Sequence, residues 1–438
     1  MSSIIFQDLR IFSASQFKES VNEPSPNTKI FLAVGKCLPW ANDASPDVPT
    51  TTQNTKIAFW DSMIGGKELA GGEIQHVIPK FTWTANTKYT SYNHLNPSLL
   101  DGNTQFYVVN SNWDVFKCLS NNYSANSTVQ PTSIITDSTF QTSDGYIWKY
   151  MYTIGEDDEF RFVTDNYIPV KTLSEDDGSL QWQVQSNAVD GGIHDIIVTS
   201  PGDSFTNANT VTITISGDGT GAVATANINV SSNVLRSIVV TNPGVGYTFA
   251  SISISGGANA AAEAIISPNN GHGSNPLYEL GGRNLVIYSK LQFDEDGKIP
   301  TTNDYRQVAL LKDPYNKGTS NIISNTVFSQ ATKIWTVGSG DYYEDEYVYQ
   351  GSSLANYTFK GAVLKWDSAN SIVYLLNTTG TPTTDALIGA TSVTSRFVSN
   401  IELGELEENT GQILYLNNIQ PVTRYEDQQE VFQIVLKF

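Results

Sequence analysis

Residues 144–154 (DGYIWKYMYTI) constrain the fold more than any other segment, because most of their side chains favour β-structure. Aromatic and β-branched residues recur from Tyr146 to Ile154, with Lys149 and Thr153 between them. This pattern predicts a strand that packs heavily on at least one face. The segment therefore predicts part of a sheet core, and it contains no catalytic motif.

The composition favours a mainly β protein of several domains. The chain has 438 residues, which is too long for one small core and suits about two or three domains. Thr, Ser, Asn and Val are abundant, and 33 Gly and 17 Pro supply frequent turns. We therefore expect strands and loops to outnumber helices.

The chain is strongly acidic, with a formal net charge of −19 and a pI near 4.5. Binding to a phosphate backbone needs clustered Lys and Arg side chains, so we expect no nucleic acid among the partners. Only 16% of the residues are charged. The acidity is therefore dispersed, and it favours solubility over any specific contact.

Neither the first residues nor the cysteines indicate export. MSSIIFQDLR lacks the basic start and long apolar stretch of a secretory signal, and no run approaches the roughly 20 apolar residues of a membrane span. Cys37 and Cys118 each lie in an apolar run, which is typical of buried thiols rather than of bridges or ligands. We expect synthesis in a reducing cytoplasm and no membrane insertion.

Two segments near the start favour short helices. In residues 7–21 (QDLRIFSASQFKESV) a helix could collect apolar side chains on one side. Residues 57–72 (IAFWDSMIGGKELAGG) offer a second helix, which Gly65 and Gly66 would interrupt. The apolar residues expected on one side of the first helix are Leu9, Ile11, Phe12, Phe17 and Val21.

A repeat of about 40 residues occupies residues 189–270, where Gly, Ala, Ser, Thr, Asn and Val dominate. In each copy the sequence predicts a first strand that ends in a Pro-Gly turn and an aromatic residue. A second strand of alternating apolar and polar residues follows, then a Gly-rich turn and a third strand of small residues. The stacked pair can bury a core that one copy could not, and it has the character of an insertion. IIVTSPGDSFT (196–206) recurs as IVVTNPGVGYT (238–248), and VTITISGDGTGAVATANI (211–228) recurs as SISISGGANAAAEAII (251–266).

A second inserted module is expected at residues 325–398. Its strands alternate apolar and polar residues, with turns at Gly351, at residues 367–370 and at Gly380. This spacing favours a small barrel of five or six strands. A main core interrupted twice is then the simplest arrangement, with core segments 1–188, 271–324 and 399–438 and inserted modules 189–270 and 325–398.

The chain offers few residues for catalysis or for metal binding. The four histidines, His76, His94, His194 and His272, lack the close spacing of a zinc site, and no GxSxG, HExxH or P-loop sequence occurs. Asp294 and Asp296 in FDEDGK lack the distal Glu of a calcium loop, so a solvated turn is favoured. Clustered carboxylates in GEDDEF and SEDDGS have no apolar wall beside them, and surface turns are the better interpretation. We expect no catalytic, cofactor or metal site.

The eight tryptophans could serve as core residues, interface anchors or sugar-stacking platforms. Alternation around Trp113, Trp148 and Trp366 favours the core. Trp40 follows Pro39 in a run that must leave its strand, so interface and core are equally supported there. Trp40 and Trp83 are the interface candidates.

Several blocks together resemble a known family. These blocks are IFLAVGKCLPW (30–40), HVIPKFTW (76–83), VFKCL (115–119), DGYIWKYMYTI, NYIPV (166–170), YRQVALL (305–311) and the TGQILYLNN…FQIVLKF segment. In this order they resemble the baseplate wedge protein family of contractile-tailed T-even-type phages (myoviruses), the gene-eight product family. Any one block alone would be an ordinary strand, so the shared order makes the resemblance specific.

The resemblance implies a structural subunit of the virion tail baseplate and no enzyme. It implies a β-sandwich core with short helical loops, a homodimer within each wedge, and contacts with other baseplate wedge subunits. The inserted modules depart from the family pattern, so the resemblance does not say what they contact. A tail adhesin or carbohydrate-binding protein is the alternative, on the basis of the Gly-, Asn-, Ser- and Thr-rich repeats and the aromatic content.

Overall fold

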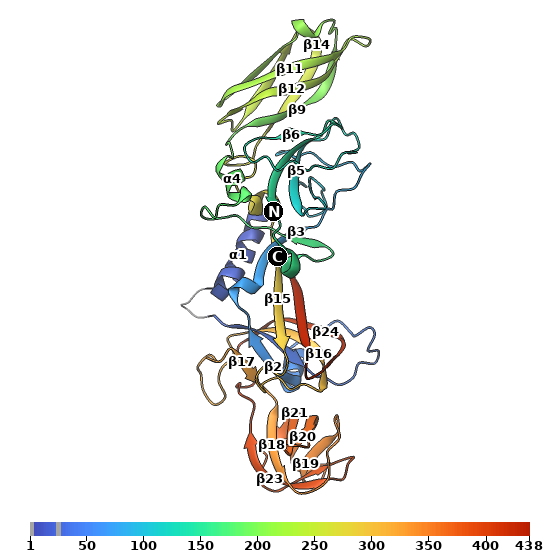
Figure 1. Cartoon of the computed structure of the whole chain (residues 1–438), viewed down its shortest axis with the longest axis vertical. Helices are drawn as coiled ribbons and strands as arrows, with labels where there is room; N and C mark the ends of the chain where they lie inside the picture. The colour runs from blue at the N-terminus through green and yellow to red at the C-terminus, as the bar shows by residue number, and fades with distance from the viewer. Residues whose placement is uncertain (1–3, 23–27) are drawn as a thin grey trace. The chain divides into compact units, whose positions relative to one another are not determined.

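The computed structural model describes residues 4–22 and 28–438, and the chain forms two compact units from separated stretches of sequence. Strands predominate, which confirms the predicted mainly β fold (Figure 1). The chain passes from one unit to the other at Gln16, Glu73, Ile287 and Phe432. Unit 1 contains Met1–Gln16, Ile74–Ile287 and Gln433–Phe438, and unit 2 contains Phe17–Glu73 and Tyr288–Phe432.

These two units do not coincide with the five predicted segments. The first predicted segment, residues 1–188, is divided between the units at Gln16 and Glu73. The repeated module belongs to unit 1 and the barrel to unit 2. Whether either module folds independently stays a prediction.

The core of unit 1 contains a four-stranded sheet that is buried on both faces. Tyr107 and Val109 of β4 lie in one apolar cluster, and Val108 between them lies in another. This arrangement explains the nearly continuous run of large residues in β7, where the sequence predicted a strand. The strands, in spatial order, are β4 (Tyr107–Val109), β5 (Asp114–Ser120), β7 (Ile147–Thr153) and β6 (Phe140–Gln141).

A second sheet packs on one face of the first and gives the predicted sandwich. Ile78 of β3 and Ile168 of β8 share a cluster with Tyr107 and Met151 of the first sheet. β15 pairs with β3, in the register Asn284 with Val77. The second sheet has the order β25 (Gln429–Lys437), β15 (Asn284–Gln292), β3 (Ile74–Pro79) and β8 (Tyr167–Pro169).

The helices of the described residues are short, with α1 the longest. α1 confirms the helix predicted at residues 7–21, and Ser179 caps α4 by accepting a hydrogen bond from the backbone N–H of Trp182 at 3.1 Å. The α-helices are α1 (Gln7–Asn22), α2 (Gln53–Ser62), α3 (Glu156–Phe162), α4 (Leu180–Ser186) and α5 (Pro276–Glu279), and 3₁₀ turns occur at Gly71–Glu73 and Ala208–Thr210.

The helix predicted at residues 57–72 is only partly present. α2 ends at Ser62, and the chain continues as the strand β2 (Met63–Glu68). Gly65 and Gly66 lie within this strand, and a Cβ atom on Gly66 would lie 2.8 Å from the Phe328 ring. The paired glycines therefore let Phe328 approach the strand closely, whereas the sequence suggested only an interrupted helix.

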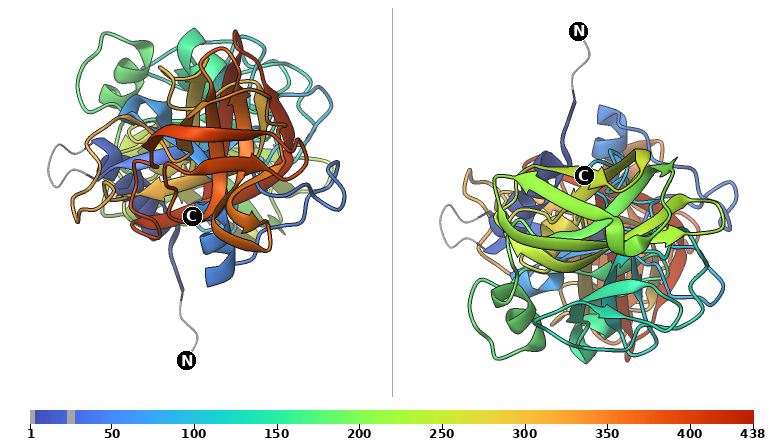
Figure 2. Two further views of the ribbon diagram at one scale, coloured as in Figure 1. Left: turned by 90° about the horizontal axis from the view of Figure 1, so that it is seen from below. Right: turned by 90° about the horizontal axis from the view of Figure 1, so that it is seen from above.

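The repeated module contains six strands, three from each copy of the repeat. Sheet order β11–β12–β9–β14 places the third strand of each copy beside the first strand of the other copy, and β10 pairs with β13 (Figure 2, right). The first copy supplies β9 (Ile193–Asp203), β10 (Thr212–Gly217) and β11 (Thr220–Asn229), and the second supplies β12 (Val234–Val245), β13 (Ala250–Ser255) and β14 (Ala258–Ile266).

The strand pairs between the two copies of the repeat join equivalent residues, so the copies are arranged as an internal twofold. Ile196 pairs with Ile238, and these residues hold the same position in the two copies. Thr214 pairs with Ser253, which are also equivalent. Each copy therefore completes the other, and the module has its own apolar cluster.

The module begins and ends at one place. Ile193 of β9 pairs with Ile266 of β14, and the N–H of Ser267 donates to the carbonyl of Gly192 at 2.9 Å. A single pair of neighbouring strands therefore joins the module to the rest of unit 1.

Unit 2 contains a five-stranded sheet and a closed barrel. β1 is fully buried at the centre of the sheet and pairs with β16 from Ile30–Lys312 to Gly35–Gln307. Phe31 and Phe328 meet edge to face at 5.3 Å between ring centroids. The strands, in spatial order, are β17 (Val327–Ser329), β2, β1 (Ile30–Gly35), β16 (Asn303–Lys312) and β24 (Gln412–Arg424).

The predicted barrel is present with six strands, in the closed order β18–β21–β20–β19–β22–β23 (Figure 2, left). Its interior is filled by apolar side chains that include Ile334, Phe359 and Leu375. The strands are β18 (Thr332–Val337), β19 (Tyr347–Ser353), β20 (Asn356–Asp367), β21 (Ile372–Gly380), β22 (Ala386–Gly389) and β23 (Ser395–Glu402), so the last strand passes the predicted boundary at Val398.

A buried ion pair joins separate parts of unit 1. Lys117 Nζ lies 2.7 Å from Glu279 Oε2 and 4.2 Å from the centroid of the Tyr92 ring. Glu279 also accepts hydrogen bonds from the backbone N–H groups of Gly273 and Asn275, at 2.8 and 3.1 Å. Burial lowers the pKa of Lys117, and the nearby Glu279 carboxylate opposes this effect. The pair therefore connects β5 to α5 and to the segment that follows the module.

Trp148 fills the cluster on the second face of the first sheet. Its ring is fully buried, stacks on Tyr146 at 5.5 Å and meets the edge of Tyr89 at 5.9 Å. Its Nε1 has no hydrogen-bond partner among the described residues. Trp148 thus contributes apolar packing alone.

Replacing Trp148 with alanine should lower the free energy of unfolding by about 3–5 kcal/mol, because it leaves a large cavity in a closely packed cluster. The matched variant Trp148→Phe should cost less, since it keeps a ring and removes an unpartnered N–H. Urea unfolding followed by circular dichroism measures both. An unchanged stability in the alanine variant would contradict this placement of the strand.

Replacing Glu279 with glutamine should cost about 3–5 kcal/mol of stability, because it leaves the buried Lys117 ammonium unpaired. The double variant Lys117→Met, Glu279→Gln should recover part of the loss. Asp157→Asn, in the exposed pair with Arg161, is the control and should cost less than about 1 kcal/mol. Urea unfolding measures the stability of each variant. Equal losses of stability in Glu279→Gln, in the double variant and in Asp157→Asn would refute the role of the buried pair.

Candidate interface residues and polar pockets

Trp40 makes a contact within unit 2. Its ring is half-buried, and its Nε1 donates to the carbonyl of Ile419 at 3.0 Å. Asn418 and Gln420 donate to the carbonyls of Asp47 and Ala44, each at 2.8 Å. The loop that contains Trp40 is therefore fastened along β24, the end strand of its sheet, where an open edge would invite pairing with other chains.

Trp83 lies at the margin of the unit 1 core. Its ring is half-buried beside the cluster that contains Tyr89 and Trp148. Its Nε1 donates to Ser127 Oγ at 3.1 Å. Both tryptophans thus use their indole N–H within the chain and leave part of the ring accessible.

Large apolar side chains are exposed around the start of α1, whereas the sequence predicted that they would collect on one side of the helix. Leu9 and Phe12 are each 54% exposed, whereas Ile11 and Ala14 are buried. The predicted collection of Leu9, Ile11 and Phe12 on one side was therefore wrong, since the helix buries Ile11 and turns the other two outward. Leu9 and Phe12, with Ile4, Ile5 and Phe6, form an exposed surface that we call the N-terminal patch.

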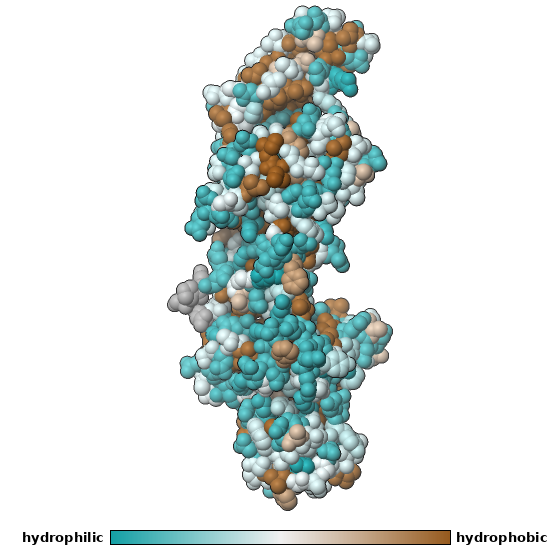
Figure 3. Space-filling view, viewed as in Figure 1, coloured by the Kyte–Doolittle hydropathy of each residue, from teal (hydrophilic) through white to brown (hydrophobic). Residues whose placement is uncertain are grey.

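A second exposed apolar surface lies on the barrel. Val337 of β18 and Phe397 of β23 are cross-strand partners, and both are more than half exposed, as is Val393. We call these three residues the barrel patch. Apolar residues are also exposed on the repeated module, where Figure 3 shows hydrophobic residues over β11 and β12. Val223 of β11 and Val239 of β12 are 51% and 42% exposed. Contiguous exposed apolar residues commonly mark protein contacts.

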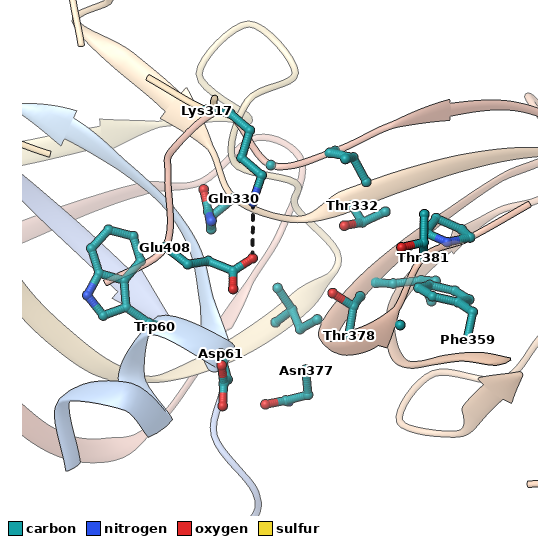
Figure 4. A pocket seen from close by; sticks show the side chains of 16 residues that line it. Trp60, Asp61, Lys317, Gln330, Thr332, Phe359, Asn377, Thr378, Thr381 and Glu408 are labelled. Atoms are coloured by element: carbon teal, nitrogen blue, oxygen red, sulfur yellow. Dashed lines mark hydrogen bonds and ion pairs between the residues drawn. The ribbon is translucent and has the colours of Figure 1, made fainter. Parts of the chain in front are cut away.

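A polar pocket of about 220 Å³ lies within unit 2, between α2 and the barrel (Figure 4). Lys317 Nζ and Glu408 Oε1 form an ion pair at 3.4 Å across it. Burial and the Glu408 charge raise the pKa of Asp61, and Trp60 is buried and cannot act as a stacking platform. The lining offers hydroxyl, amide and charged groups for hydrogen bonding, from Gln330, Thr332, Asn377, Thr378 and Thr381 among others.

The carboxylates of GEDDEF do not lie in the predicted surface turn, because Glu156–Phe162 forms the helix α3. Asp157 and Asp158 of α3 pair with Arg161 and Lys171, each at 3.1 Å. Asp294 and Asp296 lie in the turn after β15, where Glu295 pairs with Lys67 at 2.9 Å. No group of three or more His, Cys, Asp or Glu side chains in the described residues could hold a metal ion.

Two of the four histidines lie together, which the sequence spacing did not reveal. His194 and His272 meet edge to face at 4.9 Å between ring centroids, next to the Lys117–Glu279 pair. His76 instead contacts Ser15 and the carbonyl of Gly282, and His94 accepts from the N–H of Ile266 at 3.3 Å. His194 lies near the start of β9, and His272 lies in the segment that follows β14, so only the fold could show this contact.

The helices of the described residues give no sign of a membrane span. None of them is both long enough and apolar enough to cross a bilayer.

Comparison with known proteins gives one distant match to a tail protein. No protein-family model matches the chain. The chain is 22% identical to baseplate wedge protein gp8 of Enterobacteria phage T4, over 41% of this chain and 67% of that protein. This similarity agrees with the resemblance stated from the sequence blocks and supports a structural role in a phage tail.

Proposed function

We propose that this chain is a structural subunit of a contractile phage tail baseplate wedge. It holds neighbouring wedge proteins in fixed geometry during baseplate assembly and host attachment, and it catalyses no reaction. The observation that carries the proposal is the similarity to baseplate wedge protein gp8, which extends over 67% of that relative.

Rigid construction supports this role. A sheet buried on both faces, a closed barrel and a buried, hydrogen-bonded ion pair each resist deformation within their units. Exposed apolar residues occur in each unit, in the N-terminal patch and in the barrel patch. A subunit that joins several neighbours needs such rigid supports with contact surfaces on them.

We further propose that the partners are a second copy of the chain and other wedge subunits, in the virion tail baseplate. Light scattering of the purified chain at micromolar concentration should give the mass of a dimer, since isologous pairing is the commonest closed assembly. If the chain is only a monomer across this concentration range, the homodimer is contradicted. The contacts with other wedge subunits are tested separately, by the substitutions described next.

Charged substitutions in the patches should weaken wedge assembly. We expect Phe12→Asp or Phe397→Asp to reduce co-sedimentation with the products of neighbouring tail genes at least about tenfold, because a buried apolar anchor typically contributes about 2 kcal/mol or more to binding. Val230→Asp, at an exposed position in the module, is the matched control and should assemble normally. If the unaltered chain does not sediment with any tail protein, the proposed function is wrong.

A further inference from the structure

A second polar pocket lies in unit 1, where the repeated module meets the sheet of β7. Its volume is about 310 Å³, which is within the range of small-ligand sites. Lys149 of β7, His194 of β9 and His272 line it, together with Asn187 and Thr241. This site is separate from the exposed patches and does not depend on the proposed baseplate role.

The pocket contains a buried ammonium group without a carboxylate partner. Lys149 is 4% exposed, and its Nζ donates to the backbone carbonyls of Thr136 and Ser138, at 2.8 and 3.5 Å. No carboxylate of the described residues lies within ion-pair distance of it. Asp137 lines the mouth of the pocket, but its carboxylate is exposed and accepts from Ser138 Oγ at 3.0 Å. A buried ammonium normally has an anion as its counter-charge.

His272 adds a buried ring nitrogen that has no hydrogen-bond partner among the described residues. Its ring is 4% exposed and lies between His194 and Tyr92, whose ring centroids are 4.9 and 4.8 Å away. Its Nδ1 makes no hydrogen bond in the described structure. A buried ring nitrogen usually has a partner, so a ligand atom with hydrogen-bonding capacity would complete the site.

Two ammonium groups, those of Lys149 and Lys117, act on the two imidazoles. Burial, then Lys149 and Lys117, lower the pKa of His194 to about 4, and burial and the same two ammonium groups lower that of His272. Glu279 neutralises Lys117, and burial raises the pKa of Asp195 to about 6. Lys149 is therefore the ammonium group beside the rings that has no ion-pair partner among the described residues. Burial lowers its pKa to about 8, and the charges of Asp137 and Glu279 raise it. Below that pH the Lys149 ammonium would attract a negatively charged ligand.

We propose that this pocket binds a small oxyanion, of the phosphate or carboxylate class. One anion oxygen accepts from the Lys149 ammonium and a second from the ring N–H of His272, while Asn187 and Thr241 supply further polar contacts. Bidentate, charge-assisted hydrogen bonds of this kind favour an oxyanion over chloride.

Histidine NMR of the full chain at pH 7 tests the proposal directly, because the chain has only four histidines. Phosphate and acetate are titrated separately against chloride at equal ionic strength. We expect saturable shifts of the His194 and His272 ring signals and no shift for His76 and His94, with assignments from His194→Gln and His272→Gln. The anion that saturates at the lower concentration identifies the class.

Affinity measurements by calorimetry separate the site from general salt effects. Lys149→Met should weaken binding at least about tenfold, since a charge-assisted hydrogen bond is lost. Lys171→Met, at a half-exposed lysine of the same unit, should bind like the unaltered chain. Equal shifts of all four histidines, or shifts equal to those in chloride, would overturn the proposal. A Lys149→Met chain that binds as tightly as the original would also overturn it.

Discussion

The buried contact between Lys117 and Glu279 is the interaction on which the organisation of unit 1 depends. Removing two charges from water is costly, and this pair is tolerable because Glu279 also accepts two backbone N–H groups and Lys117 lies over the Tyr92 ring. The pair fixes α5 and the segment after the repeated module to β5. Glu279 is paired with Lys117, and Lys149 of the neighbouring strand β7 instead donates to the backbone carbonyls of Thr136 and Ser138.

The features described in the two units suit a protein that acts through its surfaces. Asp157 and Asp158 of α3 are held in ion pairs, Trp60 is covered, and the indole N–H groups of Trp40 and Trp83 are satisfied inside the chain. Large apolar side chains remain uncovered at Phe12 and Phe397. The distant similarity to a baseplate wedge protein agrees with this distribution, because a scaffold uses its interior for rigidity and its exterior for contacts.

The sequence predicted local structure well and long-range placement poorly. The sequence predicted β7 from its aromatic and β-branched residues, α1 from its periodicity and the repeated strands from their self-similarity. Each of these is a local property of the sequence. The sequence could not predict that the third strand of each repeat pairs with the first strand of the other, since register arises from pairing between distant segments. The same limit hid the contact of His194 with His272, and it put Phe12 on the wrong side of α1. Met63–Glu68 was missed as a strand because its two glycines resemble a helix break until Phe328 is placed, with its backbone carbonyl at Gly65 and its ring at Gly66.

The interleaving of the two units has a consequence for biosynthesis. Unit 1 includes Gln433–Phe438, and unit 2 includes residues on both sides of Ile74–Ile287. A nascent chain therefore cannot complete either unit in the order in which it is translated, and unit 1 must wait until β25 has left the ribosome. Closed local structures such as the barrel, whose strands follow one another in sequence, can form earlier. During this interval the partly formed sheets of both units have unpaired edges, and unpaired edges are sites at which a growing chain can aggregate.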